Sequence, residues 1–267
     1  MTDITFLGTG GGRFATIYQA RSTGGIFVDG TRRIHLDPGP GTLLRMKQLG
    51  IKPTDLDAVF ISHSHPDHYT DAEVLIEAMS RGGLEKRGIV LAAESVINGD
   101  GKFGPAISGY HRSLPETLKI LRPGDEYDFG VKVRATASYH ADSSTIGLMI
   151  LEREGAISYV ADTEFRDEII EQNRDARILI LPVTRPLGER IKGHLCTEDA
   201  ARIVEAVRPE LAIFTHFGLK CIREGPNLQA EWTWKKTGVK TISAVDSMAI
   251  SMRDEITVSR RVVMQKR

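Results

Sequence analysis

The residues best suited to chemistry in this sequence are three histidines and an aspartate within six positions. The segment HSHPDH, residues 63–68, directly follows the apolar run DAVFIS, so it begins where a buried strand is expected to end. Alternate residues of an extended chain point the same way, and His63 and His65 can therefore bind one metal ion. Asp67 and His68, beyond the turn that Pro66 stiffens, can reach a second ion. The chain has only eight histidines, and this clustering predicts a metal-binding motif rather than a His-rich surface loop.

Strands must hold these ligands in place, and the sequence contains many short runs rich in Val, Ile and Phe between Gly, Asp and Pro turns. Such runs predict β-strands. The early runs follow one another closely, whereas the later ones are separated by helical segments, so we expect an α/β protein with mixed sheets. The predicted strands cover residues 4–8, 25–30, 32–37, 57–62, 88–93, 131–138, 145–152, 156–162, 176–183, 211–216, 240–245 and 248–252.

Five segments show helical periodicity. The ranges 41–49, 164–174 and 228–236 predict three helices. A further helix is predicted after Thr70, which with Glu73 forms a capping-box pattern ahead of an apolar stripe of Val74, Leu75 and Met79. The fifth should begin at a Thr197 cap, bury Ile203, Val204 and Val207, and stop before Pro209. Residues 98–115 are rich in Gly and Pro and predict a long, functional or mobile loop.

Composition limits the classes of protein that fit. The 267 residues carry 35 basic and 35 acidic side chains, so the net charge gives no attraction to nucleic acid. No Pro/Ser-rich linker divides the chain, and we expect one domain over residues 1–267. No long apolar run and no signal-like start occur, which predicts a cytoplasmic protein without membrane contact. Cys196 and Cys221 are expected to be reduced thiols.

The segment HSHPDH resembles the H-x-H-x-D-H motif of the metallo-β-lactamase superfamily, and later residues match its other motifs in order. His140, Asp162 and His216 each close a predicted strand. The resemblance implies an αββα sandwich of two mixed sheets flanked by helices. It also implies one metal ion bound by His63, His65 and His140, a second bound by Asp67, His68 and His216, and Asp162 bridging both.

The implied ligands offer nitrogen and oxygen but no thiolate, which suits two zinc ions and also iron or manganese. A shared carboxylate would hold the ions about 3.5–4 Å apart, where a bridging water loses its proton near neutral pH and becomes the nucleophile. Asp67 is expected to serve in catalysis as well as in binding. Asp37, at another strand end, matches a family aspartate that hydrogen-bonds the metal-site loop, although a simple turn aspartate is an alternative. His35 is expected to be structural. Near the C-terminus, Asp246 and Met248 match the family's closing strands.

Two further motifs resemble the ribonuclease Z and phosphodiesterase branch of this superfamily. The start contains FLGTGGG, and His194 with Thr197 matches a His-x-x-Thr element whose histidine protonates the leaving oxygen or binds the scissile phosphate. The sequence departs from ribonuclease Z in two ways, because no long basic arm is evident and Val183-Thr184-Arg185 stands where an acidic residue is expected. These departures disfavour transfer RNA as a substrate. Arg185, Arg190 and Lys192 could bind a smaller anionic substrate, or could simply be solvated.

The leading hypothesis is therefore a phosphodiesterase for a small anionic molecule, with His194 assisting the leaving group. A lactonase or a carboxylic ester or thioester hydrolase is the second hypothesis, since two ions polarise a carbonyl as readily as a phosphoryl group. A non-catalytic, metal-dependent binding protein is the third. Redox chemistry at a di-iron site would call for a flavin domain, for which the sequence has no segment. Substrate, native metal and oligomeric state, a homo-oligomer included, are left open.

Overall fold

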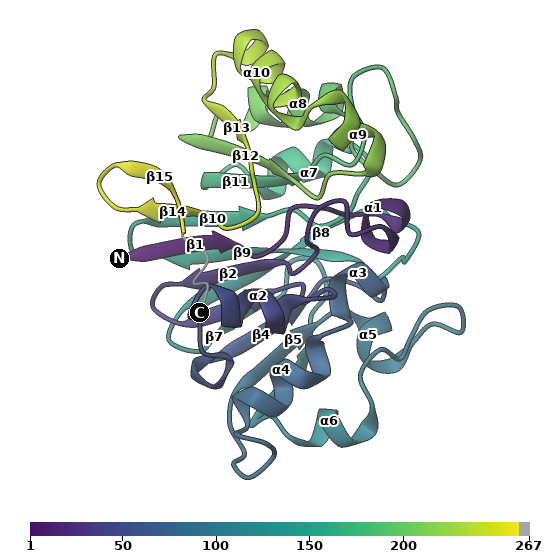
Figure 1. Ribbon diagram of the computed structural model, residues 1–267, viewed down its shortest axis with the longest axis vertical. Helices are drawn as coiled ribbons and strands as arrows, with labels where there is room; N and C mark the ends of the chain where they lie inside the picture. Colours follow the sequence, from purple (N-terminus) through teal and green to yellow (C-terminus); the bar gives the residue numbers. More distant parts are fainter. Residues whose placement is uncertain (262–267) are drawn as a thin grey trace. The chain divides into compact units, whose positions relative to one another are not determined.

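A computed structural model describes residues 1–261 and contains two mixed β-sheets (Figure 1). The chain groups into two compact units. Unit 1 comprises residues 1–9 and 22–121 and the C-terminal segment from Val245, and unit 2 comprises residues 10–21 and 122–244. Each unit is built around one of the sheets. The expectation of one domain over residues 1–267 stays a prediction.

Unit 1 holds an eight-stranded sheet with the order β15-β14-β1-β2-β3-β4-β5-β6. The strands from β15 to β3 pair antiparallel, and those from β3 to β6 pair parallel. All four residues of β4 are buried, and α4 packs against this strand. The strands are β1 (Thr2–Phe6), β2 (Ile26–Asp29), β3 (Arg33–Leu36), β4 (Ala58–Ile61), β5 (Ile89–Ala92), β6 (Thr117–Ile120), β14 (Met248–Met252) and β15 (Ile256–Arg260). The helices are α2 (Thr42–Gln48), η1 (Pro53–Asp55), α3 (Pro66–Tyr69), α4 (Ala72–Met79), α5 (Glu94–Asn98) and α6 (Gly109–Ser113).

Unit 2 holds a seven-stranded sheet with the order β13-β12-β11-β10-β9-β8-β7. The strands from β13 to β10 pair parallel, and those from β10 to β7 pair antiparallel. Helix α8 packs against β11 and α10 against β12, and their apolar sides share one buried cluster with these strands. The strands are β7 (Glu126–Asp128), β8 (Lys132–Ala137), β9 (Ile146–Glu152), β10 (Gly155–Tyr159), β11 (Ala176–Pro182), β12 (Leu211–Thr215) and β13 (Thr241–Ser243). The helices are α1 (Arg13–Ile17), α7 (Asp167–Gln172), α8 (Thr197–Val207), α9 (Leu219–Glu224) and α10 (Pro226–Thr237).

The predicted helices are present, but two of their caps are wrong. Thr70 does not cap α4, because the Thr70 hydroxyl donates to the carbonyl of Pro66 in the preceding short helix α3. Asp71 occupies the N-cap of α4 instead. Val74 is 45% exposed and lies outside the buried stripe, which Leu75, Ile76 and Met79 form.

Thr197 is likewise not the cap of α8. It is the first helical residue, and its hydroxyl donates to Gln229 on α10 instead. The predicted buried side of α8, with Ile203, Val204 and Val207, is confirmed. Among residues 1–261, no helix combines the length and apolar character needed to span a membrane.

Candidate metal centre

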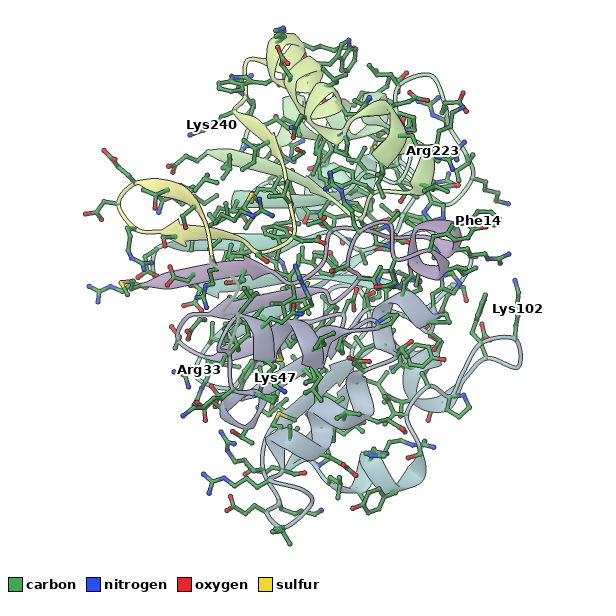
Figure 2. The ribbon with its side chains drawn as sticks, viewed as in Figure 1. Phe14, Arg33, Lys47, Lys102, Arg223 and Lys240 are labelled. Atoms are coloured by element: carbon green, nitrogen blue, oxygen red, sulfur yellow. The ribbon has the colours of Figure 1, made fainter. Side chains whose placement is uncertain are left out.

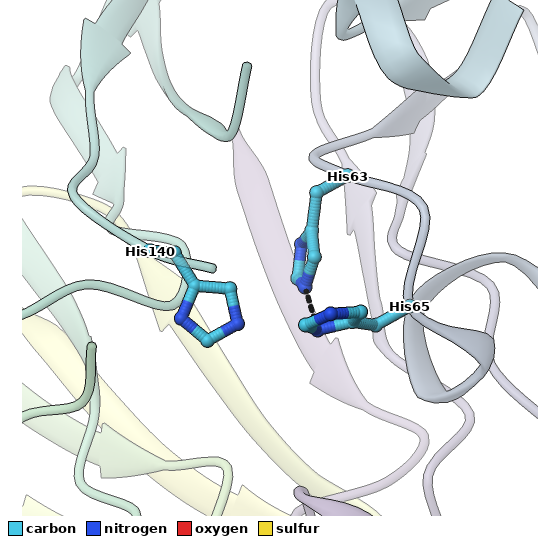
Figure 3. A group of neighbouring side chains, drawn as sticks. All are labelled: His63, His65 and His140. Carbon is cyan, nitrogen blue, oxygen red and sulfur yellow. Dashed lines mark hydrogen bonds between the residues drawn. The ribbon is translucent and has the colours of Figure 1, made fainter. Parts of the chain in front are cut away.

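Four potential ligands, His63, His65, Asp67 and His68, lie together at the carboxyl end of β4 in unit 1, and we call them the first donor group. His63 Nε2 lies 2.9 Å from His65 Nδ1, the contact drawn as a dashed line in Figure 3. In a tetrahedral site with metal–nitrogen bonds of 2.0–2.1 Å, two ligand nitrogens are about 3.3 Å apart. The two imidazoles therefore already have nearly the spacing that a shared ion requires.

The turn after His65 fixes the other two members. Pro66 begins α3, where its missing N–H costs nothing, and the His68 N–H donates to the His65 carbonyl at 2.9 Å. This brings His68 Nε2 to 3.7 Å from Asp67 Oδ2. Gly39 packs against the same turn so closely that a Cβ on it would lie 2.1 Å from the Asp67 carbonyl oxygen. The backbone around Asp67 therefore has little freedom to move.

Asp37 links the first donor group to strands β3 and β4. Its carboxylate lies 2.7 Å from His68 Nδ1 and accepts bonds from the Ser62 N–H at 2.7 Å and the Ser62 hydroxyl at 2.6 Å. Asp37 is 3% exposed and has a φ of 51°, a left-handed conformation that Asp tolerates better than most residues. The Ser62 hydroxyl also lies 2.9 Å from His63 Nδ1. Asp37 is thus more than a turn residue, since it orients His68 and leaves its Nε2 available to a metal ion.

Unit 2 carries a second donor group, His140, Asp162, His194 and His216, located just after β8, β10 and β12 and before α8. Asp162 is 2% exposed and central to it. One carboxylate oxygen lies 3.1 Å from His216 Nδ1, and the other lies 3.6 Å from His194 Nδ1 and 3.8 Å from His140 Nε2. Ligand atoms of His140, Asp162 and His194 all lie within 4.8 Å of one another, which is close enough to hold an ion.

Backbone contacts orient two of these imidazoles. His140 Nδ1 lies 2.7 Å from the Gly193 carbonyl, which can only accept, so Nδ1 carries the proton and Nε2 is left as a potential ligand atom. His216 has a φ of 54°, a left-handed conformation that is uncommon for residues other than glycine but that His adopts more often than most. The Gly-rich turn before α1 packs closely against its side chain, because a Cβ on Gly11 would lie 2.2 Å from the His216 ring.

Thr184 belongs to the segment Val183-Thr184-Arg185, in which the sequence departs from the ribonuclease Z pattern. Its hydroxyl lies 3.2 Å from His216 Nδ1 and 3.4 Å from His194 Nδ1. This neutral hydroxyl therefore contacts both histidines. The sequence marks this segment only as a departure from the family and gives no sign of Ser62 or Gly193, because their contacts depend on the folded loops.

The three basic residues in the loop before His194 differ in their partners. Arg185 is paired with Glu189, 3.3 Å away, and Arg190 is paired with the buried Asp199, with contacts of 2.5 and 3.0 Å. Lys192 is exposed, and within residues 1–261 no carboxylate lies within salt-bridge distance of it. Of these three, Lys192 is therefore best placed to meet an anion.

The remaining predicted residues have structural surroundings. His35 is fully buried in β3, and burial lowers its pKa to about 3, so it stays neutral as a structural histidine should. Asp246 accepts from the Thr9 hydroxyl at 2.7 Å and the Ser22 N–H at 2.9 Å, which ties the start of β14 to the chain after β1. Both cysteines are free and buried, and burial raises the pKa of each to about 12.

The predicted long loop is shorter than expected, because α5 extends to Asn98 and α6 occupies residues 109–113. Lys102 projects from the loop between them (Figure 2). The neighbouring Phe103 ring lies edge-on to the His65 ring, with 5.1 Å between centroids, so the loop borders the first donor group.

Comparisons with known proteins identify the family and the fold. Residues 32–217 match the family described as "Beta-lactamase superfamily domain". An uncharacterized protein of Methanocaldococcus jannaschii is 42% identical over 246 residues, which cover 91% of this chain and 92% of that protein. A ribonuclease Z of Pyrococcus abyssi is 38% identical over 126 residues, or 45% of this chain and 40% of that protein. The solved structure of the metallo-beta-lactamase fold protein YhfI from Bacillus subtilis is 18% identical, with a TM-score of 0.76 over 93% of this chain and 98% of that chain. The predicted α/β fold, with two mixed sheets flanked by helices, is thereby confirmed.

Proposed function

The chain belongs to the metallo-β-lactamase superfamily, and from that premise we propose that it is a two-metal hydrolase that cleaves phosphodiester bonds in small anionic molecules. The observation that carries this proposal is His194, whose Nδ1 lies 3.6 Å from the buried Asp162 within the second donor group. An imidazole beside the predicted bridging carboxylate is well placed to deliver a proton during catalysis.

The two donor groups would together bind two divalent ions. His63, His65 and His140 would hold one ion, Asp67, His68 and His216 the other, and Asp162 both. The residues suit this role, because they offer only nitrogen and oxygen donors and because Asp37 and Gly193 fix the outer nitrogens of His68 and His140. Zinc fits such ligands, and so do iron and manganese. When bound, two such ions would activate water and neutralise charge on the phosphoryl oxygens.

The remaining steps fall to the protein's own side chains. The oxygen of the attacking water forms a bond to phosphorus, and the bond from phosphorus to the leaving oxygen breaks. His194 donates its proton to that leaving oxygen, which otherwise departs as an unstable alkoxide. Thr184, in contact with both His194 and His216, keeps the two rings in a fixed relation while the proton moves. Asp67 accepts a hydrogen bond from the attacking water, the proton that this water loses passes to the solvent, and the solvent returns a proton to His194.

A small substrate is favoured over transfer RNA. The loop over residues 99–108 carries a single basic residue, Lys102, together with Asp100, and so lacks the charge of a long basic arm. The net charge of zero adds no long-range attraction for a polyanion.

The test is hydrolysis by the metal-loaded protein of bis(4-nitrophenyl) phosphate, of a diester with an alkyl leaving group, and of a set of lactones. We expect cleavage of both diesters. His194→Ala should lower kcat on the alkyl diester by about 10²–10⁴-fold, because an alkoxide needs the proton, and should lower it less on the nitrophenyl ester. His111→Ala, at a partly buried histidine that is paired with Glu73 and belongs to neither donor group, is the matched control and should change neither rate.

Two outcomes would contradict the proposal. Lactone hydrolysis without diester cleavage, unaffected by His194→Ala, would indicate a carboxylic ester hydrolase. Stoichiometric metal with tight ligand binding and no turnover of any substrate would indicate a binding protein.

A further inference from the structure

A cavity of about 290 Å³ lies in unit 2 beside the second donor group. His194 forms part of its wall, and the remainder comes from the segment after Asp162, the loop before His194 and the first turns of α8. The imidazole of His194 therefore borders both Asp162 and this cavity. A molecule with its scissile group near Asp162 can therefore extend past His194 into the cavity.

The carboxylates in the cavity wall are already neutralised. Asp199, 3% exposed, is held by the Arg190 guanidinium, and Glu164 accepts from Arg166 at 2.5 Å and from the Gly193 N–H at 3.3 Å. Each of the two acidic groups thus has its own arginine.

Two further cations in the cavity wall do not pair with a carboxylate of the described residues. Lys192 and Arg202 line the cavity, both are exposed, and among the described residues neither has a carboxylate within salt-bridge distance. With the acidic groups paired, these two side chains leave the cavity with a surplus of positive charge. Guanidinium and ammonium groups together suit a phosphate or a carboxylate.

The cavity also offers an apolar surface. The Arg202 guanidinium lies over the Phe165 ring, 3.7 Å from its centroid, and both side chains line the cavity. Phe165 packs in turn against the buried core of unit 2, which holds it in place. A phenyl ring and a guanidinium are both groups on which an aromatic or heterocyclic ring can stack.

We propose that this cavity binds the departing half of the substrate, and that this half is a ring bearing a second anionic group, held between Lys192 and Arg202. The inference rests on the proposed function in one respect, namely that the occupant is the substrate's leaving half. His194 then stands between the scissile phosphoryl group and the ring, where its proton reaches the leaving oxygen.

The test uses phosphonates, which bind but cannot be hydrolysed. Affinities of the full-length, metal-loaded protein for phenylphosphonate, 3-carboxyphenylphosphonate and benzene-1,3-diphosphonate are compared by calorimetry. The wild type should bind the two probes with a second anionic group at least about tenfold more tightly than phenylphosphonate, since each adds a charged contact. The tighter of the two identifies the second group as phosphate-like or carboxylate.

The double variant K192Q/R202Q should lose this preference, whereas the control Arg153→Gln, in the exposed turn between β9 and β10, should keep it. Equal binding of all three probes by the wild type, or a preference that persists in the double variant, would overturn the proposal. Because no probe is cleaved, the result is independent of turnover. A protein that hydrolyses no diester yet shows the preference would refute the proposed function and leave the anion-binding cavity standing.

Discussion

His68 Nδ1 lies 2.7 Å from Asp37 Oδ2, and both side chains are almost completely buried. The carboxylate also accepts two bonds from Ser62, so a single aspartate fixes a predicted ligand and the end of β4 together. A histidine ligand held in this way keeps one tautomer and one ring orientation before any ion arrives.

Replacing Asp37 should therefore weaken metal binding without removing a ligand. In Asp37→Asn, which tolerates the same left-handed backbone, we expect metal affinity to fall by about 10–100-fold. Competition with a chromogenic chelator measures it. Asp55→Asn, at an exposed aspartate in η1, serves as the control, and equal affinities in the two variants would show that Asp37 does not orient the site.

Gly11→Ala should disturb His216 specifically. The added Cβ would lie 2.2 Å from the imidazole, and the ring cannot stay where it is. We expect loss of the ion assigned to Asp67, His68 and His216, seen as a lower metal content by mass spectrometry. Gly109→Ala is the matched control, because nothing lies within 4 Å of its Cβ. Full metal content in Gly11→Ala would argue against the placement of His216.

His35 should make the protein less stable in acid. Its folded-state pKa of about 3 is below the ordinary 6.5. Between these two pH values the unfolded chain therefore binds a proton at His35 that the folded protein does not bind. Stability is therefore lost as the pH falls below 6.5, by about 2 kcal/mol between pH 7 and pH 5. Urea unfolding of wild type and His35→Leu at both pH values, with saturating metal, measures it. The variant should show a smaller loss, and equal losses would disprove the assignment.

Neither cysteine should react in the native protein. Cys196 and Cys221 are 1% and 0% exposed, and burial raises the pKa of both to about 12, which leaves almost no thiolate at pH 8. An aromatic disulfide reagent should therefore label the folded protein slowly and both thiols at once in denaturant. Rapid labelling of a native thiol would show that its surroundings open readily.

The strands were predictable where burial made them continuously apolar, as in β4 and β11. Strands β6, β7 and β15 were missed because they are short or solvent-exposed and carry polar residues, as in Glu126–Asp128. The prediction of a cap at Thr70 was wrong because the end of the metal motif forms a separate short helix, α3, and Thr70 lies at the end of that helix.

The candidate site, too, could be predicted only in part. The predicted ligands stand at strand ends, which the sequence marks clearly, and their order matched a known family. The contacts of Thr184 and Gly193 could not be predicted, because each joins positions far apart in the chain. Thr184 meets His216 across 32 residues, and Gly193 meets His140 across 53.

The two donor groups differ in how far along the chain their members are spread. The first lies within residues 63–68, whereas the second spans residues 140–216 and exists only once the sheet of unit 2 has formed. An unfolded chain therefore keeps a short chelating peptide with three imidazoles and a carboxylate. A ligand that also binds the unfolded state stabilises the fold by less than its native affinity implies. Added metal should thus raise the melting temperature less than its tight binding to the native protein suggests, and the ion should remain attached to residues 63–68 after the protein has melted.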